Sequence, residues 1–325
     1  MKIGLFTDGL MHLSFEDALK TAAHLGVQAI EIGTGNFSSA PHCDLSGLLV
    51  SEVSRRTFLD TVAAHGLHLA ALNCSGNPLH PNEQVARQAA EVTRQTLQLA
   101  GLLGVERVVC MSGCPGTPAG GQYPNWVVAT WPEDFLELLE WQWRERVIPF
   151  WGEMAELASK HGVRKLCFEL HPGMCVYNPT SFRRLREAIG TSVAANLDPS
   201  HFFFQGMDPL AVIRVLGEDI GYVHAKDARV DPYNLSVHGS LDLQPGRPVR
   251  DLVWAYRTLG YGHAENFWAD FVSALRSIGY DSVLSIEHED PLMDAEEAIA
   301  RAVNLLNKTV FFKAPSSVPG TPPAF

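Results

Sequence analysis

The chain has 325 residues, of which 46% are hydrophobic and 19% charged, and its formal net charge is −11 at pH 7. This is the composition of an ordinary globular protein that can bury a large core. The acidic balance disfavours binding to a nucleic-acid backbone, which normally requires a basic face. No apolar run is long enough to cross a bilayer, and Met1 leads directly into a predicted strand, so we expect a cytoplasmic protein.

Short β-type runs alternate with amphipathic helical stretches, which is the pattern of parallel βα units. The first strand is predicted at residues 2–7, and Ser14 caps the helix after it, with Glu16 and Asp17 in the first turn. Further strands are predicted at residues 27–32, 67–73, 107–112, 165–170, 193–197, 220–225 and 282–286. Further helices are predicted at residues 50–65, 82–103, 134–161, 180–189, 209–216, 265–278 and 295–306.

The same junction recurs between these helices and strands: a glycine that ends the helix, then an apolar residue that enters the next strand. It occurs at Gly26, Gly66, Gly104, Gly162 and Gly279. The repetition predicts a single-domain α/β fold, a closed (β/α)₈ TIM barrel, rather than an open doubly wound sheet. We assign the barrel to residues 1–308 and a Pro-rich C-terminal extension to residues 309–325.

Two long segments, residues 113–132 and 228–263, interrupt the alternation. Both follow predicted strands, on the side where barrel enzymes place their substrate loops. A phosphate-carrying substrate would need arginines, and the second segment offers Arg247, Arg250 or Arg257 for that role. The six cysteines are scattered without a paired framework and predict reduced thiols.

Four consecutive predicted strands end in a side chain of metal-ligand type: Glu169, Asp198, His224 and Glu287. Any one of them could be a strand-end hydrogen-bonding group, but in a closed barrel all four converge. Three carboxylates packed together repel one another and need a cation between them. Oxygen ligands with one imidazole favour Mn²⁺ first, with Mg²⁺, Co²⁺ or Zn²⁺ as competitors. The pattern therefore predicts one bound divalent metal ion.

These segments resemble the sugar phosphate isomerase/epimerase superfamily, the xylose isomerase-like barrels that include ketose 3-epimerases and inosose dehydratase-like proteins. The resemblance spans residues 1–308 and is carried by Glu169, Asp198-x-x-His201, His224-x-Lys226-Asp227, Gly260-Tyr261-Gly262 and Ile286-Glu287. It implies that Glu169 and Glu287 bind the metal and also shuttle protons, while Asp198 and His224 complete the metal site.

The resemblance also implies that His201 contacts the substrate. We expect His171, Lys226, Asp227 and Arg257 to contribute to the same pocket. The family's epimerases carry a substrate-binding arginine a few residues after the strand-seven histidine, and Arg229 stands near that position.

A metal on adjacent oxygens of a hydroxy-ketone acidifies the neighbouring C–H and stabilises an enediolate, which two carboxylates can deprotonate and reprotonate. We therefore expect a metal-dependent isomerase or epimerase of a sugar or polyol. A lyase acting on a keto-sugar, keto-inositol or 3-keto-glycoside is the alternative. The superfamily's repair endonucleases use several metals and a basic groove, which the acidic balance disfavours. We expect no nucleic-acid or membrane partner. We expect the protein to form a homodimer or a homotetramer.

Overall fold

The structure is a computed structural model that describes residues 1–242 and 245–313. Residues 314–325, which make up most of the predicted Pro-rich extension, lie outside the described residues. Within the described residues, no helix is both long and apolar enough to cross a membrane.

Eight parallel strands form a closed barrel in the order β1-β10-β7-β6-β5-β4-β3-β2. The predicted (β/α)₈ barrel is thereby confirmed. The strands are β1 (Lys2–Phe6), β2 (Ala29–Gly33), β3 (His68–Asn73), β4 (Arg107–Cys110), β5 (Lys165–Glu169), β6 (Val193–Leu197), β7 (Ile220–Ala225) and β10 (Val283–Ile286). Two further strands, β8 (Asp227–Val230) and β9 (Trp254–Arg257), pair only with each other.

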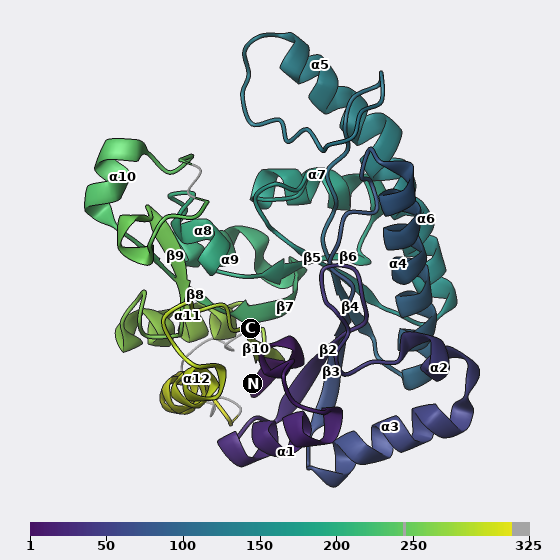
Figure 1. Cartoon of the computed structure of the whole chain (residues 1–325), viewed down its shortest axis with the longest axis vertical. Helices are drawn as coiled ribbons and strands as arrows, with labels where there is room; N and C mark the ends of the chain where they lie inside the picture. The colour runs from purple at the N-terminus through teal and green to yellow at the C-terminus, as the bar shows by residue number, and fades with distance from the viewer. Residues whose placement is uncertain (243–244, 314–325) are drawn as a thin grey trace, which may run out of the picture. The chain divides into compact units, whose positions relative to one another are not determined.

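Helices follow the strands along the chain (Figure 1). They are α1 (Phe15–Leu25), α2 (Leu45–Val50), α3 (Glu52–Ala64), α4 (Glu83–Leu103), α5 (Asp134–Trp141), α6 (Ile148–Lys160), α7 (Pro179–Ile189), α8 (Ser200–Phe203), α9 (Pro209–Leu216), α10 (Pro232–His238), α11 (Glu265–Ser277) and α12 (Ala295–Thr309). Short 3₁₀ turns cover Thr7–Leu10, Gly217–Asp219 and Val249–Asp251.

Local sequence signals explain where these helices begin and end. The Ser14 side chain accepts a hydrogen bond from the backbone N–H of Asp17 and so caps α1, as predicted. Gly26 ends the same helix at a φ of 94°, in the left-handed region that glycine enters without steric strain. The recurring glycine junctions are therefore real helix ends.

The chain divides into two compact units. One contains residues 31–64 and 69–196, and the other contains residues 1–30, 65–68 and the chain from Leu197 onward. We call them the β2–β6 unit and the β7–β10 unit.

In the β2–β6 unit, strands β3 to β6 pair in parallel, with Val109 opposite Cys167 and Phe168 opposite Ala195. Helices α4 and α6 lie side by side (Figure 1). The buried ring of Trp151 on α6 meets the ring of Phe168 edge-on, with centroids 4.6 Å apart, and its indole N–H donates to the carbonyl of Ser112 at 2.9 Å. This packing fixes the strand that leads to Glu169.

In the β7–β10 unit, β10 pairs in parallel with both β1 and β7. Ile286 lies opposite Leu5 on one side and opposite Ala225 on the other, and all three side chains are buried. Trp268 and Phe271 of α11 are fully buried in the core of this unit. The ends of β7 and β10 are therefore held level with each other.

Two predicted segments differ in the structure. The single helix predicted at residues 134–161 is divided by a π-helical stretch, Gln142–Val147, before α6 begins. Pro149 lies in the first turn of α6, and its missing N–H breaks the regular hydrogen-bond ladder there. The loop predicted at residues 228–263 holds the β8–β9 hairpin and α10.

Candidate functional site

The ends of β6, β7 and β10 carry three of the predicted metal ligands within the β7–β10 unit. Asp198 directly follows β6, His224 lies in β7, and Glu287 directly follows β10. Because Ser285 pairs with His224 and the N–H of Glu287 donates to the carbonyl of Ala225 at 3.3 Å, the Glu287 side chain lies beside the end of β7. We call Asp198, His201, His224, Lys226 and Glu287 the mouth cluster.

The ligand-type atoms of the mouth cluster lie close together. Those of Asp198, His224 and Glu287 all lie within 4.8 Å of one another. His224 Nδ1 is 3.2 Å from Glu287 Oε2, and the side chains of His224, Asp198 and Glu287 are 0%, 0% and 14% exposed. Two carboxylates and an imidazole buried at this separation form the kind of donor set that binds a divalent cation.

Lys226 places a positive charge among these carboxylates. Its ammonium lies 2.9 Å from Glu287 Oε2, 3.3 Å from Asp198 Oδ2 and 3.4 Å from Glu289 Oε2. Burial alone would lower the pKa of Lys226, but the three carboxylates outweigh it and hold that pKa well above its usual value. Burial would likewise raise the pKa of Glu287, which Lys226 and His224 instead bring well below its usual range.

The mouth-cluster carboxylates are not saturated by hydrogen bonds. Asp198 Oδ2 and Glu287 Oε2 are buried, and neither accepts a hydrogen bond of good geometry from any described residue. Lys226 lies within ion-pair distance of both oxygens. Buried lone pairs of this kind are rare unless a ligand uses them. The residues present are therefore suited to holding a metal ion.

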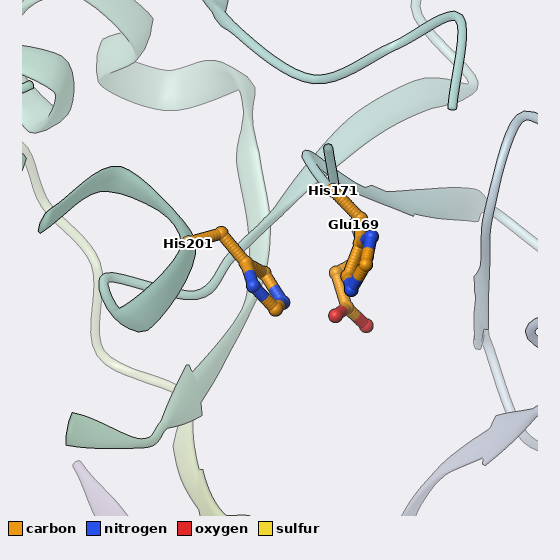
Figure 2. A group of neighbouring side chains, drawn as sticks. All are labelled: Glu169, His171 and His201. Atoms are coloured by element: carbon orange, nitrogen blue, oxygen red, sulfur yellow. The ribbon is translucent and has the colours of Figure 1, made fainter. Parts of the chain in front are cut away.

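His201, the predicted substrate contact, lies in α8 and is fully buried. Its Nε2 lies 3.3 Å from Asp198 Oδ2, and its Nδ1 lies 3.2 Å from the hydroxyl of Tyr256. Burial lowers the pKa of His201 to about 4, so the imidazole is neutral at pH 7. Figure 2 shows its ring extending from α8.

Asp227, also a predicted substrate contact, uses its carboxylate to bind the backbone of a neighbouring loop. Its carboxylate accepts four backbone N–H groups, from Ala228, Gly260, Gly262 and His263, at 2.9–3.2 Å. The His263 ring adds a contact of 2.8 Å. A side chain at Gly262 would place its Cβ 2.4 Å from an Asp227 oxygen, so glycine is required there. The substrate role of Asp227 stays a prediction, and its visible role is to hold the Gly260–Tyr261–Gly262 loop.

Arg257 is held by a second buried carboxylate. Its Nε lies 3.2 Å from both oxygens of Asp290, which also accept from the backbone N–H groups of Thr258 and Leu292. Burial would raise the pKa of Asp290, but these hydrogen bonds outweigh it and lower that pKa. The predicted substrate role of Arg257 likewise stays a prediction.

In the β2–β6 unit, Glu169 ends β5 and is buried, and His171 follows it in a half-buried position (Figure 2). His171 Nδ1 contacts the carbonyl of Pro172 at 2.5 Å. A further buried carboxylate of this unit, Glu31 of β2, accepts a hydrogen bond from Asn73 at 2.8 Å.

Sequence reasoning missed three residues of these clusters: Tyr256, Glu289 and Glu31. Trp254-Ala255-Tyr256-Arg257 shows no alternation of apolar and polar residues, so the sequence carried no signal that places Tyr256 on one face of a hairpin. The Lys226 ammonium lies 4.5 Å from the centre of the Tyr256 ring, so Tyr256 faces the mouth cluster. For Glu31, a single acidic residue within an apolar strand was the available signal.

The chain belongs to the xylose isomerase-like TIM barrel family, whose model matches residues 19–309. The superfamily suggested by the strand-end motifs is thereby confirmed.

One sequence relative and two solved structures are similar to this chain. A protein of Bacillus subtilis (strain 168) described as uncharacterized protein YfiH is 39% identical over 312 residues, which cover 95% of this chain and 99% of that protein. A D-tagatose 3-epimerase-like protein is 20% identical with a TM-score of 0.63, covering 95% of this chain and 98% of its own. The IOLI protein, described with a bound zinc atom, is also 20% identical with a TM-score of 0.63, covering 96% and 100%.

Proposed function

We propose that this protein is a divalent-metal-dependent isomerase or epimerase of a sugar or polyol that acts by proton transfer next to a carbonyl group. The observation that carries the proposal is the mouth cluster, in which buried carboxylate oxygens face an imidazole nitrogen without saturating hydrogen bonds. Such oxygens gain most from a ligand that accepts their lone pairs.

We assign the metal to Asp198, His224, Glu287 and Glu169. Support for the fourth ligand comes from the position of Glu169, a buried carboxylate that ends β5 as Asp198 and Glu287 directly follow β6 and β10. Mn²⁺ is our first choice because three carboxylates and one imidazole form an oxygen-rich donor set. The zinc described in the IOLI protein supports a divalent ion in this fold and makes Zn²⁺ the first competitor.

The chain's own residues would carry out the proton transfer. A bound divalent ion supplies Lewis acidity that weakens the C–H bond beside the substrate carbonyl. Glu169 and Glu287 are our acid–base pair: one carboxylate takes the proton and the other returns it. Neutral His201 can hydrogen-bond a substrate hydroxyl, and Lys226 can hold a developing negative charge on oxygen. The D-tagatose 3-epimerase-like neighbour supports a ketose as the substrate class.

The test combines metal analysis with solvent exchange. The purified protein, loaded with Mn²⁺, is incubated in D₂O with free ketoses, keto-inositols and 3-keto-glycosides and followed by NMR. We expect deuterium at the carbon next to the carbonyl and inversion at that carbon for one ketose. Asp198→Ala and His224→Ala should lose both the metal and the exchange, whereas Asp281→Asn, a change at an exposed carboxylate outside the site, should keep both.

Two outcomes would contradict the proposal. Unchanged metal content in both alanine variants would refute the metal assignment. Exchange accompanied by loss of water or of an aglycone, without inversion, would replace the isomerase by the alternative lyase that uses the same proton abstraction.

A further inference from the structure

The β8–β9 hairpin has two chemically different faces. In its antiparallel register, Asp227 lies opposite Arg257 and Arg229 lies opposite Ala255, so these four side chains share one face. The other face carries Tyr256, which contacts His201 and Lys226 of the mouth cluster. The arginines therefore lie on the side of the hairpin away from the mouth cluster.

A pocket of about 310 Å³ lies at this arginine face. Arg229, Arg250 and Arg257 line it, Asp231 is its one acidic lining residue, and Leu252 and Leu292 contribute apolar walls. Three guanidinium groups gathered in one pocket are unusual on a chain whose net charge is −11. Like charges repel, so such a grouping needs negative charge nearby.

The buried carboxylate of Asp290 pairs with only part of the Arg257 guanidinium. Asp290 contacts Arg257 through Nε alone, and the structure gives no hydrogen bond to the two Nη groups within the described residues. Arg257 is only 15% exposed, and its guanidinium is fixed by Asp290, which is fully buried. The arrangement leaves a pre-oriented pair of donors for a ligand, and an oriented guanidinium loses little entropy on binding.

The other charged groups of the pocket leave its arginines only loosely paired. Arg229 is exposed and forms no ion pair within the described residues. Arg250 is 82% exposed and lies 3.7 Å from Asp251, a loose contact. Asp231 uses one carboxylate oxygen to cap α10, accepting the N–H of Asn234 at 2.8 Å. Several guanidinium N–H donors around the pocket therefore have no close carboxylate partner within the described residues.

We propose that this pocket, lined by Arg229, Arg250 and Arg257, is a second ligand site that binds a phosphate group, as free phosphate or as a phosphate ester, separately from the metal site. Guanidinium forks match phosphate oxygens in geometry, and a phosphate monoester carries close to two negative charges above its second pKa of about 6.

The position of the site ties it to the mouth cluster. Arg257 and Tyr256 are neighbours in β9, one facing the phosphate pocket and the other facing His201 and Lys226. A phosphate bound to Arg257 would therefore lie one residue away from Tyr256, on the opposite face of the same strand.

The test measures phosphate binding to the full-length protein by isothermal titration calorimetry in the presence of EDTA, which keeps phosphate from binding through a metal. Inorganic phosphate and glucose 6-phosphate are titrated separately to distinguish the free anion from an ester. Arg229→Gln and Arg250→Gln change exposed side chains and leave the Arg257–Asp290 pair intact. Arg247→Gln is the matched control, because Arg247 pairs with Asp242 at 2.7 Å and does not line the pocket.

We expect saturable binding of one phosphate per chain, weakened about tenfold by each of the two pocket substitutions, the loss typical of one charge-assisted hydrogen bond. Arg247→Gln should bind like the parent protein. The proposal is overturned if phosphate binds only without EDTA, if it fails to saturate below about 10 mM, or if Arg247→Gln weakens binding as much as the other two. Because the measurement needs no turnover, its result is independent of the proposed isomerase activity.

Discussion

Two pairs of buried carboxylates in the β7–β10 unit have the same appearance in the sequence and opposite surroundings in the structure. Asp198 and Glu287 face Lys226 and His224, and each keeps an oxygen without a hydrogen bond of good geometry. Asp227 and Asp290 are instead filled by backbone N–H groups from neighbouring loops. All four follow or begin strands at the same end of the chain's βα units.

The comparison shows what distinguishes a carboxylate that supports the fold from one that is available for chemistry. Backbone N–H donors fill the lone pairs permanently and stabilise the ionised form at one place in the loop. Side-chain cations neutralise the charge while leaving lone pairs that can take a metal or a proton. Asp227 and Asp290 thus belong to the first kind, and Asp198 and Glu287 to the second.

The largest expected effect comes from Glu287→Gln, which keeps the size of the side chain and one ligating oxygen but removes the proton acceptor. Turnover at saturating metal should fall by about two to four orders of magnitude, the usual contribution of general acid–base catalysis. Steady-state kinetics on the accepted ketose measures it. Glu289→Gln, at a 47% exposed position two residues away, is the control and should lose less than about tenfold. Near-full turnover in Glu287→Gln would remove this glutamate from the mechanism.

The reverse prediction applies to Asp227→Ala, which should damage stability rather than metal binding. Four backbone N–H groups would lose their acceptor, and we expect the free energy of unfolding to fall by about 3–5 kcal/mol. Urea denaturation measures the loss, and elemental analysis of the folded fraction should still find the metal. Asp251→Ala, an exposed change in the same unit, should leave both values unchanged. A stable Asp227→Ala protein without metal would instead place Asp227 among the carboxylates available for chemistry.

A smaller effect is expected for Gly262→Ala, which leaves Asp227 in place but disturbs its loop. The new Cβ would lie 2.4 Å from both the carbonyl oxygen of Ala228 and an oxygen of Asp227, so the loop must move away. We expect destabilisation of about 1–3 kcal/mol, measured by thermal melting. Gly152→Ala is the matched control, since nothing lies within 4 Å of the added atom, and it should be neutral or stabilising. Equal melting temperatures for the two variants would contradict the close packing of Gly262 against Asp227 and Ala228.

The smallest effect concerns Asp281, an exposed carboxylate beside the N-terminal amine at 2.5 Å and Arg276 at 3.0 Å. The hydrogen bond from the N-terminal amine is the main cause of the lowered pKa of Asp281. Because the folded-state pKa lies below the unfolded one, the stabilisation is present above the unfolded value and is lost as the pH falls through the folded one. Asp281→Asn should therefore cost about 0.5 kcal/mol at pH 7 and less at pH 4, by urea denaturation. A loss that grows toward low pH would have the wrong sign.

Much of the fold follows from local signals in the sequence. Strands β6 and β7 and helix α9 have the predicted bounds, because glycine, proline and polar caps mark their ends sharply. The metal-type residues were found because a charged group at the end of an apolar strand is conspicuous. The roles assigned to those residues remain a proposal, since the sequence does not show which lone pairs are already filled.

The hairpin could not be predicted because its two strands are short and far apart along the chain. Asp227 pairs with Arg257, and no local pattern fixes the register of four-residue strands across such a separation. The same reason hid Tyr256, whose contact with His201 exists only once β9 is folded back onto β8. Loop-borne groups held by long-range pairing are the part of the site that single-sequence reasoning misses.

The alternation of β9 sets how this protein can change over evolution or in engineering. Tyr256 and Arg257 point to opposite faces of β9. Deleting one residue before them would turn each side chain to the other face, so the mouth cluster would lose Tyr256 and the arginine pocket would lose Arg257. Substitutions in β9 alter one face at a time, whereas changes in its length alter both. The connection from Asp231 to Val253 joins the two strands and lies outside their paired residues. Length variation among related chains should therefore collect in that connection and be absent from residues 254–257.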